Sequence, residues 1–161
     1  MVRRRREAAL LDIYIDADAC PVKNETYKVA ERYGLQVIVV AADWMRAPLH
    51  EWIRVVAAGS DFDAADNWIA ENVQEDDIVI TADIPLAARC LEKKARVLDH
   101  RGGEFDEASI GDALASRELL STLRETGEIT GGPRPFDQRQ RSKYLQELDR
   151  TINALRKKGA R

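Results

Sequence analysis

Aspartates stand at the ends of strand-like stretches of this sequence, or at the start of a helix-like one. Asp16 and Asp18 follow one apolar run, Asp63 and Asp66 open a helix-like segment, and Asp83 follows another apolar run. The carboxyl ends of neighbouring parallel strands meet at one edge of a sheet, where ligands bind. Carboxylates gathered there repel one another by a few kcal/mol per close pair at an effective dielectric of about 20. Because Mg²⁺ and Mn²⁺ prefer oxygen ligands, the pattern predicts an acidic metal site.

Most of these aspartates also have a purely structural explanation. Asp18 and Asp83 could each cap the helix that follows them. Asp63 and Asp66 are three residues apart, on one helical face, where acidic side chains stabilise a helix N-terminus without any ligand. Asp16 is the hardest to explain structurally, because a charge at the end of an apolar central strand has no obvious partner. Asp16 is therefore the strongest candidate for a metal ligand among these aspartates.

A hydroxyl and several basic side chains accompany the aspartates. Thr81 precedes Asp83 by two residues, so a hydroxyl and a carboxylate meet at one strand end, a common arrangement around a metal ion or its bound water. Three basic residues lie just past strand ends or on the first turns of helices, namely Lys23, Arg46 and Arg89. They could hold a phosphate group, and they could equally be solvated charges.

The histidines and cysteines do not form a metal-binding pattern. His50 and His100 are solitary, and Cys20 and Cys90 are far apart with no Cys-x-x-Cys motif. Zinc is therefore disfavoured. We expect both cysteines to be buried free thiols, as in a reducing compartment.

Composition describes one globular domain of ordinary size. The chain has 161 residues, 45% of them apolar and 33% charged, with a formal net charge of −3. The longest apolar run, at residues 37–42, is the length of a strand and too short to cross a membrane. Arg3 to Arg6 precede no long apolar segment, so we expect no secretory signal and a cytoplasmic protein.

Strand-like and helix-like segments alternate, which predicts an α/β fold with a mostly parallel central sheet. Strands are expected at residues 13–16, 36–42, 52–57, 78–82 and 95–98. Helices are expected at residues 21–33, 63–73, 85–94 and 106–126, and from 137 past 155. Asp63 is expected to cap the second of these helices, and Gly34 and Gly127 are expected to end the first and the fourth. Apolar residues of the fourth, among them Leu119 and Leu120, recur at helical spacing and predict an apolar face.

Three parts are expected along the chain. An arginine-rich extension occupies residues 1–10, and the α/β domain occupies residues 11–130. Residues 131–161 contain a Gly/Pro break followed by a basic, amphipathic C-terminal helix. The apolar stripe of this helix either packs on the domain or binds a partner.

Four blocks of the sequence carry a family likeness, namely Tyr14 to Lys23, Asp61 to Asp66, Asp77 to Ala87 and Thr126 to Pro133. They resemble the YaiI/YqxD family of uncharacterised bacterial proteins, and the likeness extends from about residue 12 to residue 152. The resemblance implies a three-layer PIN-like domain, whose nucleases gather acidic residues at the carboxyl edge of a parallel sheet. Relatives often read Ser-Asp-Gly-Phe-Asp where this chain reads Gly59-Ser60-Asp61-Phe62-Asp63, a loss of glycine that is expected to stiffen the loop.

The leading functional hypothesis is a Mg²⁺- or Mn²⁺-dependent nuclease that acts on RNA or, as a second choice, on DNA. In the family pattern Asp16, Asp63 and Asp83 match the catalytic carboxylates and would ligate one or two ions. Asp18 or Asp66 would complete the metal's coordination or orient a water molecule. The basic residues named above would neutralise the phosphate.

Two other functions are open at this stage. A phosphatase of the haloacid dehalogenase type would use the nucleophile and acid pair that Asp16-Ala17-Asp18 mimics, but it needs a Ser or Thr after a second strand, where this chain has Ala41-Ala42. A non-catalytic protein that binds a nucleic acid or the ribosome would keep a vestigial acidic site. Its basic C-terminal segment would then contact the polyanion.

Overall fold

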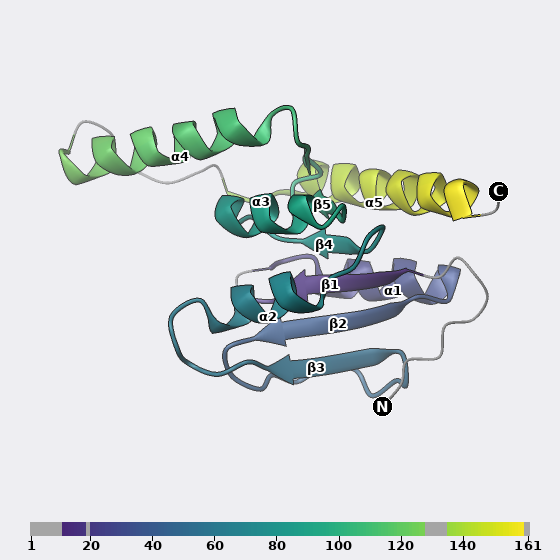
Figure 1. Cartoon of the computed structure of the whole chain (residues 1–161). Helices are drawn as coiled ribbons and strands as arrows, with labels where there is room; N and C mark the ends of the chain where they lie inside the picture. Colours follow the sequence, from purple (N-terminus) through teal and green to yellow (C-terminus); the bar gives the residue numbers. More distant parts are fainter. Residues whose placement is uncertain (1–10, 19, 128–134, 160–161) are drawn as a thin grey trace.

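A six-stranded, mostly parallel sheet forms the middle of the molecule (Figure 1). The computed structural model describes residues 11–18, 20–127 and 135–159. The strand order is β3-β2-β1-β4-β5-β6, with only β6 antiparallel to its neighbour. The strands are β1 (Asp12–Asp16), β2 (Gln36–Ala41), β3 (Ile53–Ala57), β4 (Ile78–Ile80), β5 (Arg96–Leu98) and β6 (Glu104–Phe105). The predicted α/β fold with a mostly parallel sheet is confirmed.

Helices cover both faces of this sheet, which gives the three predicted layers. The helices are α1 (Lys23–Tyr33), α2 (Ala64–Asn72), α3 (Ile84–Glu92), α4 (Ile110–Glu125) and α5 (Gln138–Gly159). α1 and α5 pack on one face, and α2 and α3 pack on the other. All five predicted helices and five predicted strands are present. The sequence missed β6, because a strand of two residues has no periodicity to detect.

The central strands are apolar on both faces because both faces are covered. Ile13 and Ile15 of β1 are fully buried in the core beneath α1 and α5. Tyr14, which lies between them, belongs to the core beneath α2 and α3. Side chains of a strand alternate between faces, so a sheet enclosed in this way needs continuous apolar runs. The chain supplies such runs in β1, β2 and β4.

The C-terminal helix α5 packs on the domain. Its apolar stripe, formed by Tyr144, Leu148, Ile152 and Leu155, is buried against the sheet. The Tyr144 hydroxyl lies 2.6 Å from the Thr26 hydroxyl of α1, so a buried hydrogen bond joins the two helices. Of the two predicted arrangements, packing on the domain is therefore the one that forms.

Helix α4 behaves differently from the other helices. It extends away from the body at the upper left of Figure 1, and it has no buried residue. Leu119 is 59% exposed and Leu120 is 40% exposed, although both were expected to be part of an apolar face. The predicted stop at Gly127 is present, with φ of 80°. The predicted arginine-rich extension and most of the Gly/Pro break lie outside the described residues.

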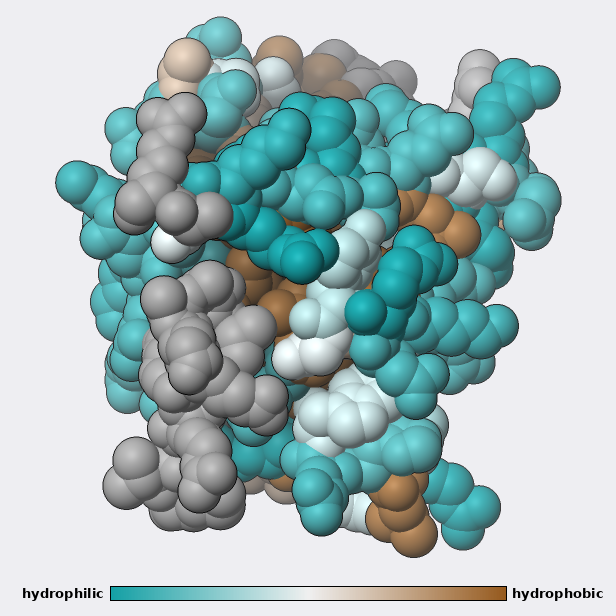
Figure 2. Space-filling view, turned by 90° about the vertical axis from the view of Figure 1, so that its right-hand side faces the viewer, coloured by the Kyte–Doolittle hydropathy of each residue, from teal (hydrophilic) through white to brown (hydrophobic). Residues whose placement is uncertain are grey.

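The side of the molecule at the amino ends of the strands is mainly polar. Figure 2 views this side, the right-hand side of Figure 1, and hydrophilic residues cover most of its coloured surface. Within residues 11–18, 20–127 and 135–159, no helix has the length and apolar character needed to cross a membrane. The two cysteines, Cys20 and Cys90, are buried and free, as predicted.

Thr151→Val is expected to raise the free energy of unfolding by about 1 kcal/mol, because a buried hydroxyl without a partner is destabilising. The Thr151 Oγ1 atom is buried in α5 and has no hydrogen-bond partner in the described part of the chain. Valine keeps the shape and removes the polar atom. Urea unfolding followed by circular dichroism measures the change.

Thr26→Val is the matched control for this substitution. The Thr26 hydroxyl donates to the Val22 carbonyl oxygen at 2.7 Å and also pairs with Tyr144. Its removal is expected to lower the free energy of unfolding by about 1–3 kcal/mol. Equal losses in the Thr26 and Thr151 variants would contradict the assignment of an unpaired hydroxyl to Thr151.

Candidate metal centre

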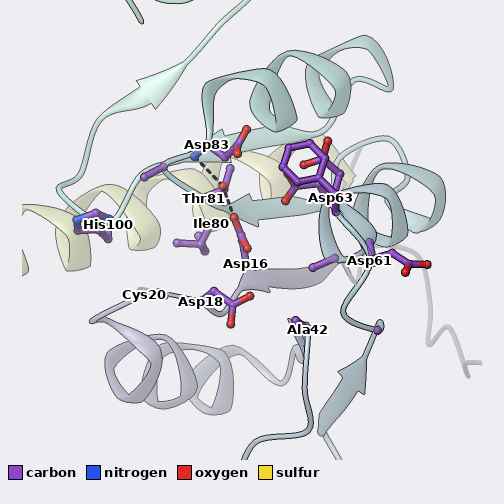
Figure 3. A pocket seen from close by; sticks show the side chains of 16 residues that line it. Asp16, Asp18, Cys20, Ala42, Asp61, Asp63, Ile80, Thr81, Asp83 and His100 are labelled. Carbon is purple, nitrogen blue, oxygen red and sulfur yellow. Dashed lines mark hydrogen bonds between the residues drawn. The ribbon is translucent and has the colours of Figure 1, made fainter. Parts of the chain in front are cut away.

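A cavity of about 450 Å³ opens at the carboxyl edge of the sheet, where β1 and β4 end and α2 and α3 begin (Figure 3). Thr81 lines this cavity together with six aspartates, namely Asp16, Asp18, Asp61, Asp63, Asp66 and Asp83. The five aspartates predicted as metal ligands are therefore brought to one place. The sheet brings together aspartates that lie up to 67 positions apart in the sequence.

Asp16, Thr81 and Asp83 form one hydrogen-bonded unit. The Thr81 hydroxyl donates to Asp16 Oδ2 at 2.7 Å, and it accepts from the backbone N–H of Asp83 at 2.9 Å. The dashed lines in Figure 3 mark both bonds. The unit exists because β1 and β4 pair in parallel with Ile15 opposite Ile80, which places the next residue of each strand side by side. Thr81 therefore fixes where the Asp16 carboxylate points.

Asp83 caps the helix that follows it, as its structural explanation predicts, and one of its carboxylate oxygens remains available. It is the N-cap of α3, and its Oδ1 accepts from the Leu86 N–H at 2.9 Å. A carboxylate has two oxygens and about four lone-pair positions. Capping therefore leaves the second oxygen of Asp83 available to a ligand.

Asp63 lies at the N-cap position of α2, but its side chain makes no capping hydrogen bond. The expectation that it is a good cap is therefore wrong for the carboxylate. Its backbone has φ of 61°, a left-handed conformation that is strained for a residue other than glycine. Backbone strain of this kind, about 1–3 kcal/mol, clusters at ligand sites. The strained turn presents the Asp63 carboxylate to the cavity instead of to the helix.

The carboxylates repel one another. The pKa of Asp66 is raised to about 6, mainly by burial and then by the negative charges of Asp83, Asp16 and Asp63, against the opposing charge of Arg89. Burial also raises the pKa of Asp16, where neighbouring aspartates add to the effect and its hydrogen bond opposes it. Excess negative charge at the carboxyl edge is the main electrostatic feature of the site.

The donor atoms fit a hard cation, although the side chains do not yet surround one. Carboxylate oxygens and a hydroxyl are ligands for Mg²⁺ or Mn²⁺. The one thiol on the cavity wall, Cys20, is buried, and burial is the main cause of its raised pKa, which favours the neutral thiol. Among the described residues, no three acidic, histidine or cysteine side chains lie close enough to hold one ion as they stand. An ion that binds here has to draw the carboxylates inward.

The three predicted phosphate-binding residues do not line the cavity. The Lys23 ammonium donates to two backbone carbonyl oxygens in the loop after β1. Arg89 Nη1 donates to Asn67 Oδ1 of α2 at 2.7 Å. Arg46 is exposed in the connection between β2 and β3. A phosphate role for these residues stays a prediction, and two of them already have partners within the fold.

Sequence reasoning did not assign His100 or Phe62 to the site, yet both line the cavity. His100 follows the end of β5, at the same edge as the aspartates, and packs against Phe136 at 5.5 Å between ring centroids. Burial, and then the charge of Arg101, lowers the pKa of His100. Its position just past a predicted strand was a usable signal. It was overlooked because the residue has no metal-ligand spacing.

Fold and cavity together define an α/β protein with an acidic cavity at the carboxyl edge of a mostly parallel sheet. Residues 14–154 match the model of a family described as "Uncharacterized BCR, YaiI/YqxD family", and the chain belongs to this family. The resemblance found in the sequence is thereby confirmed.

The relatives match along nearly their whole length. A UPF0178 protein of Rhodopseudomonas palustris (strain BisB5) is 56% identical over 154 residues, which cover 96% of this chain and 94% of the relative. Protein BRADO3147 of Bradyrhizobium sp. (strain ORS 278) is 53% identical with the same coverage. Protein RC1_2062 of Rhodospirillum centenum is 51% identical over 92% of this chain and 99% of its own. No solved structure matches the chain.

Asp66→Asn is expected to raise the melting temperature of metal-free protein at about pH 8 and to leave it unchanged at about pH 4. Folding raises the pKa of Asp66 from 3.8 to about 6, so the native state holds the proton more tightly than the unfolded chain. Ionised Asp66 therefore destabilises the fold fully above that range, and the effect fades as the pH falls through it. Thermal unfolding in EDTA at both pH values measures the difference.

Glu71→Gln provides a control for the same helix. Glu71 is exposed on α2 and does not line the cavity. Its variant should change the melting temperature by the same small amount at both pH values. A pH-independent effect of Asp66→Asn would contradict the electrostatic account of the site.

Proposed function

We propose that the protein is a Mg²⁺- or Mn²⁺-dependent nuclease that hydrolyses phosphodiester bonds, with RNA preferred over DNA. The observation that carries this proposal is the gathering of Asp16, Asp63, Asp66 and Asp83 around one cavity, with the pKa of Asp66 raised by burial and then by the other three carboxylates. A cluster of repelling carboxylates destabilises a fold unless a cation uses it. The resemblance to PIN-like nucleases, which place carboxylates at this edge, supports the same assignment.

Each acidic residue has a distinct part in this proposal. Asp16 and Asp83 are the fixed ligands, since Thr81 and the first turn of α3 hold one oxygen of each. Asp63 and Asp66 lie one turn apart at the start of α2 and supply the ligands that move inward. A bound divalent cation supplies Lewis acidity to the phosphodiester and lowers the pKa of a water molecule.

The alternative of a non-catalytic polyanion-binding protein gains little support from α5. Several of its basic side chains are already paired within the fold. Arg141 pairs with Glu25, and Lys158 pairs with Asp76. Arg150 pairs with Glu147 of the same helix. These ion pairs reduce the positive charge that α5 offers to a polyanion.

Titration of Mn²⁺ or Mg²⁺ into metal-free protein is expected to show binding that Asp16→Asn and Asp83→Asn abolish, because each variant removes a ligand charge. Asp112→Asn, on the exposed helix α4, is the control and should bind as the wild type does. Isothermal titration calorimetry measures the affinity. Metal binding that survives both Asn variants would place the ion elsewhere and overturn the proposal.

Thr81→Val is expected to lower metal affinity by about 10–100-fold while the fold is retained, because partners that orient metal ligands have effects of this size. Thr81→Ser keeps the hydroxyl that donates to Asp16 and should restore most of the affinity. Equal affinities in the Val and Ser variants would show that the hydrogen bond does not position the ligand.

Activity is tested with Mn²⁺ on single-stranded RNA, double-stranded RNA and single-stranded DNA, with a phosphomonoester alongside. The nuclease proposal expects cleavage of a nucleic acid that is lost in Asp16→Asn. Hydrolysis of the monoester alone would point to the haloacid dehalogenase type of chemistry, in which Asp16 is a nucleophile. Binding of nucleic acid that Asp16→Asn leaves unchanged, without any cleavage, would favour the non-catalytic alternative.

A further inference from the structure

An exposed aromatic ring stands at the rim of the acidic cavity. Phe62 lines the cavity, yet 91% of its surface is exposed to solvent. It lies between Asp61 and Asp63, which Figure 3 labels on the same loop. A phenylalanine buries a large apolar surface when it is covered, so leaving it in water forgoes much stabilisation. Packing among the described residues does not account for the position of this ring.

A tight turn holds Phe62 in place. The Ala64 N–H donates to the Asp61 carbonyl oxygen at 3.0 Å, which closes a four-residue turn with Phe62 at its second position. The left-handed backbone of Asp63 completes that turn and leads directly into α2. The position of the ring is therefore set by the backbone beside a proposed metal ligand, rather than by contacts with the core.

The cavity lacks the usual means of orienting a polyanion. Among the described residues that line it, none is lysine or arginine. Asp61 and Asp63 add negative charge on either side of Phe62, so the rim repels a phosphate backbone. A contact that is neutral and tolerant of sequence is what remains to orient a nucleotide, and stacking of a base on an aromatic ring is such a contact.

We propose that Phe62 is a specificity-determining residue that stacks on an unpaired nucleobase next to the scissile phosphate. The inference rests on the proposed nuclease function. One sugar joins a base to its phosphate, so a phosphate at the carboxylates places the base near the side chain adjoining Asp63. In a duplex both faces of a base are covered by its neighbours. The site therefore takes single-stranded or looped nucleic acid and discriminates against paired strands.

The test is a double-mutant cycle between the ring and the base. The substrate is a short single-stranded RNA whose wild-type cleavage position has been mapped, and a second RNA is abasic at the nucleotide next to that position. Phe62→Ala is expected to lower kcat/KM on the first RNA by about tenfold, the size of one stacking contact. On the abasic RNA the wild type and Phe62→Ala should have the same kcat/KM, because the base that would stack on the ring is already absent.

Two further variants keep the comparison specific. Phe62→Trp retains a stacking face and should preserve the wild-type kcat/KM. Leu49→Ala removes another exposed apolar side chain, 99% accessible, from a separate groove beside β3 and should have no effect. Mn²⁺ affinity should be the same in all these proteins, since none of the changes touches a carboxylate.

The outcomes separate this inference from the function on which it rests. If the wild type cleaves RNA and Phe62→Ala cleaves it equally well, the stacking role is overturned and the nuclease function stands. A tenfold loss that persists on the abasic RNA would also overturn the stacking role. If the wild type cleaves no nucleic acid, the proposed function fails and this inference fails with it.

Discussion

The parallel pairing of β1 with β4 is the constraint on which the rest of the site depends. Residues about 65 positions apart become neighbours because Ile15 lies opposite Ile80, and both side chains are buried in the core beneath α1 and α5. The apolar faces of these strands therefore determine the register. The register in turn puts the Thr81 hydroxyl 2.7 Å from Asp16 Oδ2, where the strands leave the core. A one-residue slip would reverse the faces of the strand and destroy both the core and the hydrogen bond.

Stability and site chemistry oppose each other at this edge of the sheet. The two packed layers of helices stabilise the strands along their length, whereas the carboxylates beyond the strand ends repel one another and the backbone of Asp63 is strained. Burial and neighbouring charge hold the pKa of Asp66 near 6. A domain with a well-packed core can tolerate several kcal/mol of such local destabilisation. The acidic cavity therefore lowers the stability of the fold, and the stability of the core allows it to exist.

Much of the fold could be predicted from local patterns, and the exceptions have physical causes. The helix stop at Gly34 was predictable because glycine adopts the left-handed conformation seen there, with φ of 67°. Asp63 was assigned as a helix cap from its residue type, but side-chain capping requires a backbone geometry that this turn does not adopt. The apolar positions of α4 resembled a buried face. Burial needs a surface to pack against, and the described domain provides none for Leu119.

Apart from the two-residue strand β6, the sequence by itself determined which segments are strands and helices and which aspartates stand at their ends, since both follow from local periodicity and residue type. It did not determine the strand order β3-β2-β1-β4-β5-β6, nor that α5 packs on the domain. Those features depend on contacts between distant residues, and several arrangements satisfy the same local pattern. Tertiary structure also placed His100 and Phe62 on the cavity wall and paired Arg89 with Asn67, so that Arg89 does not line the wall. Residue types thus predicted the acidic character of the site, while tertiary packing determined which side chains line the cavity.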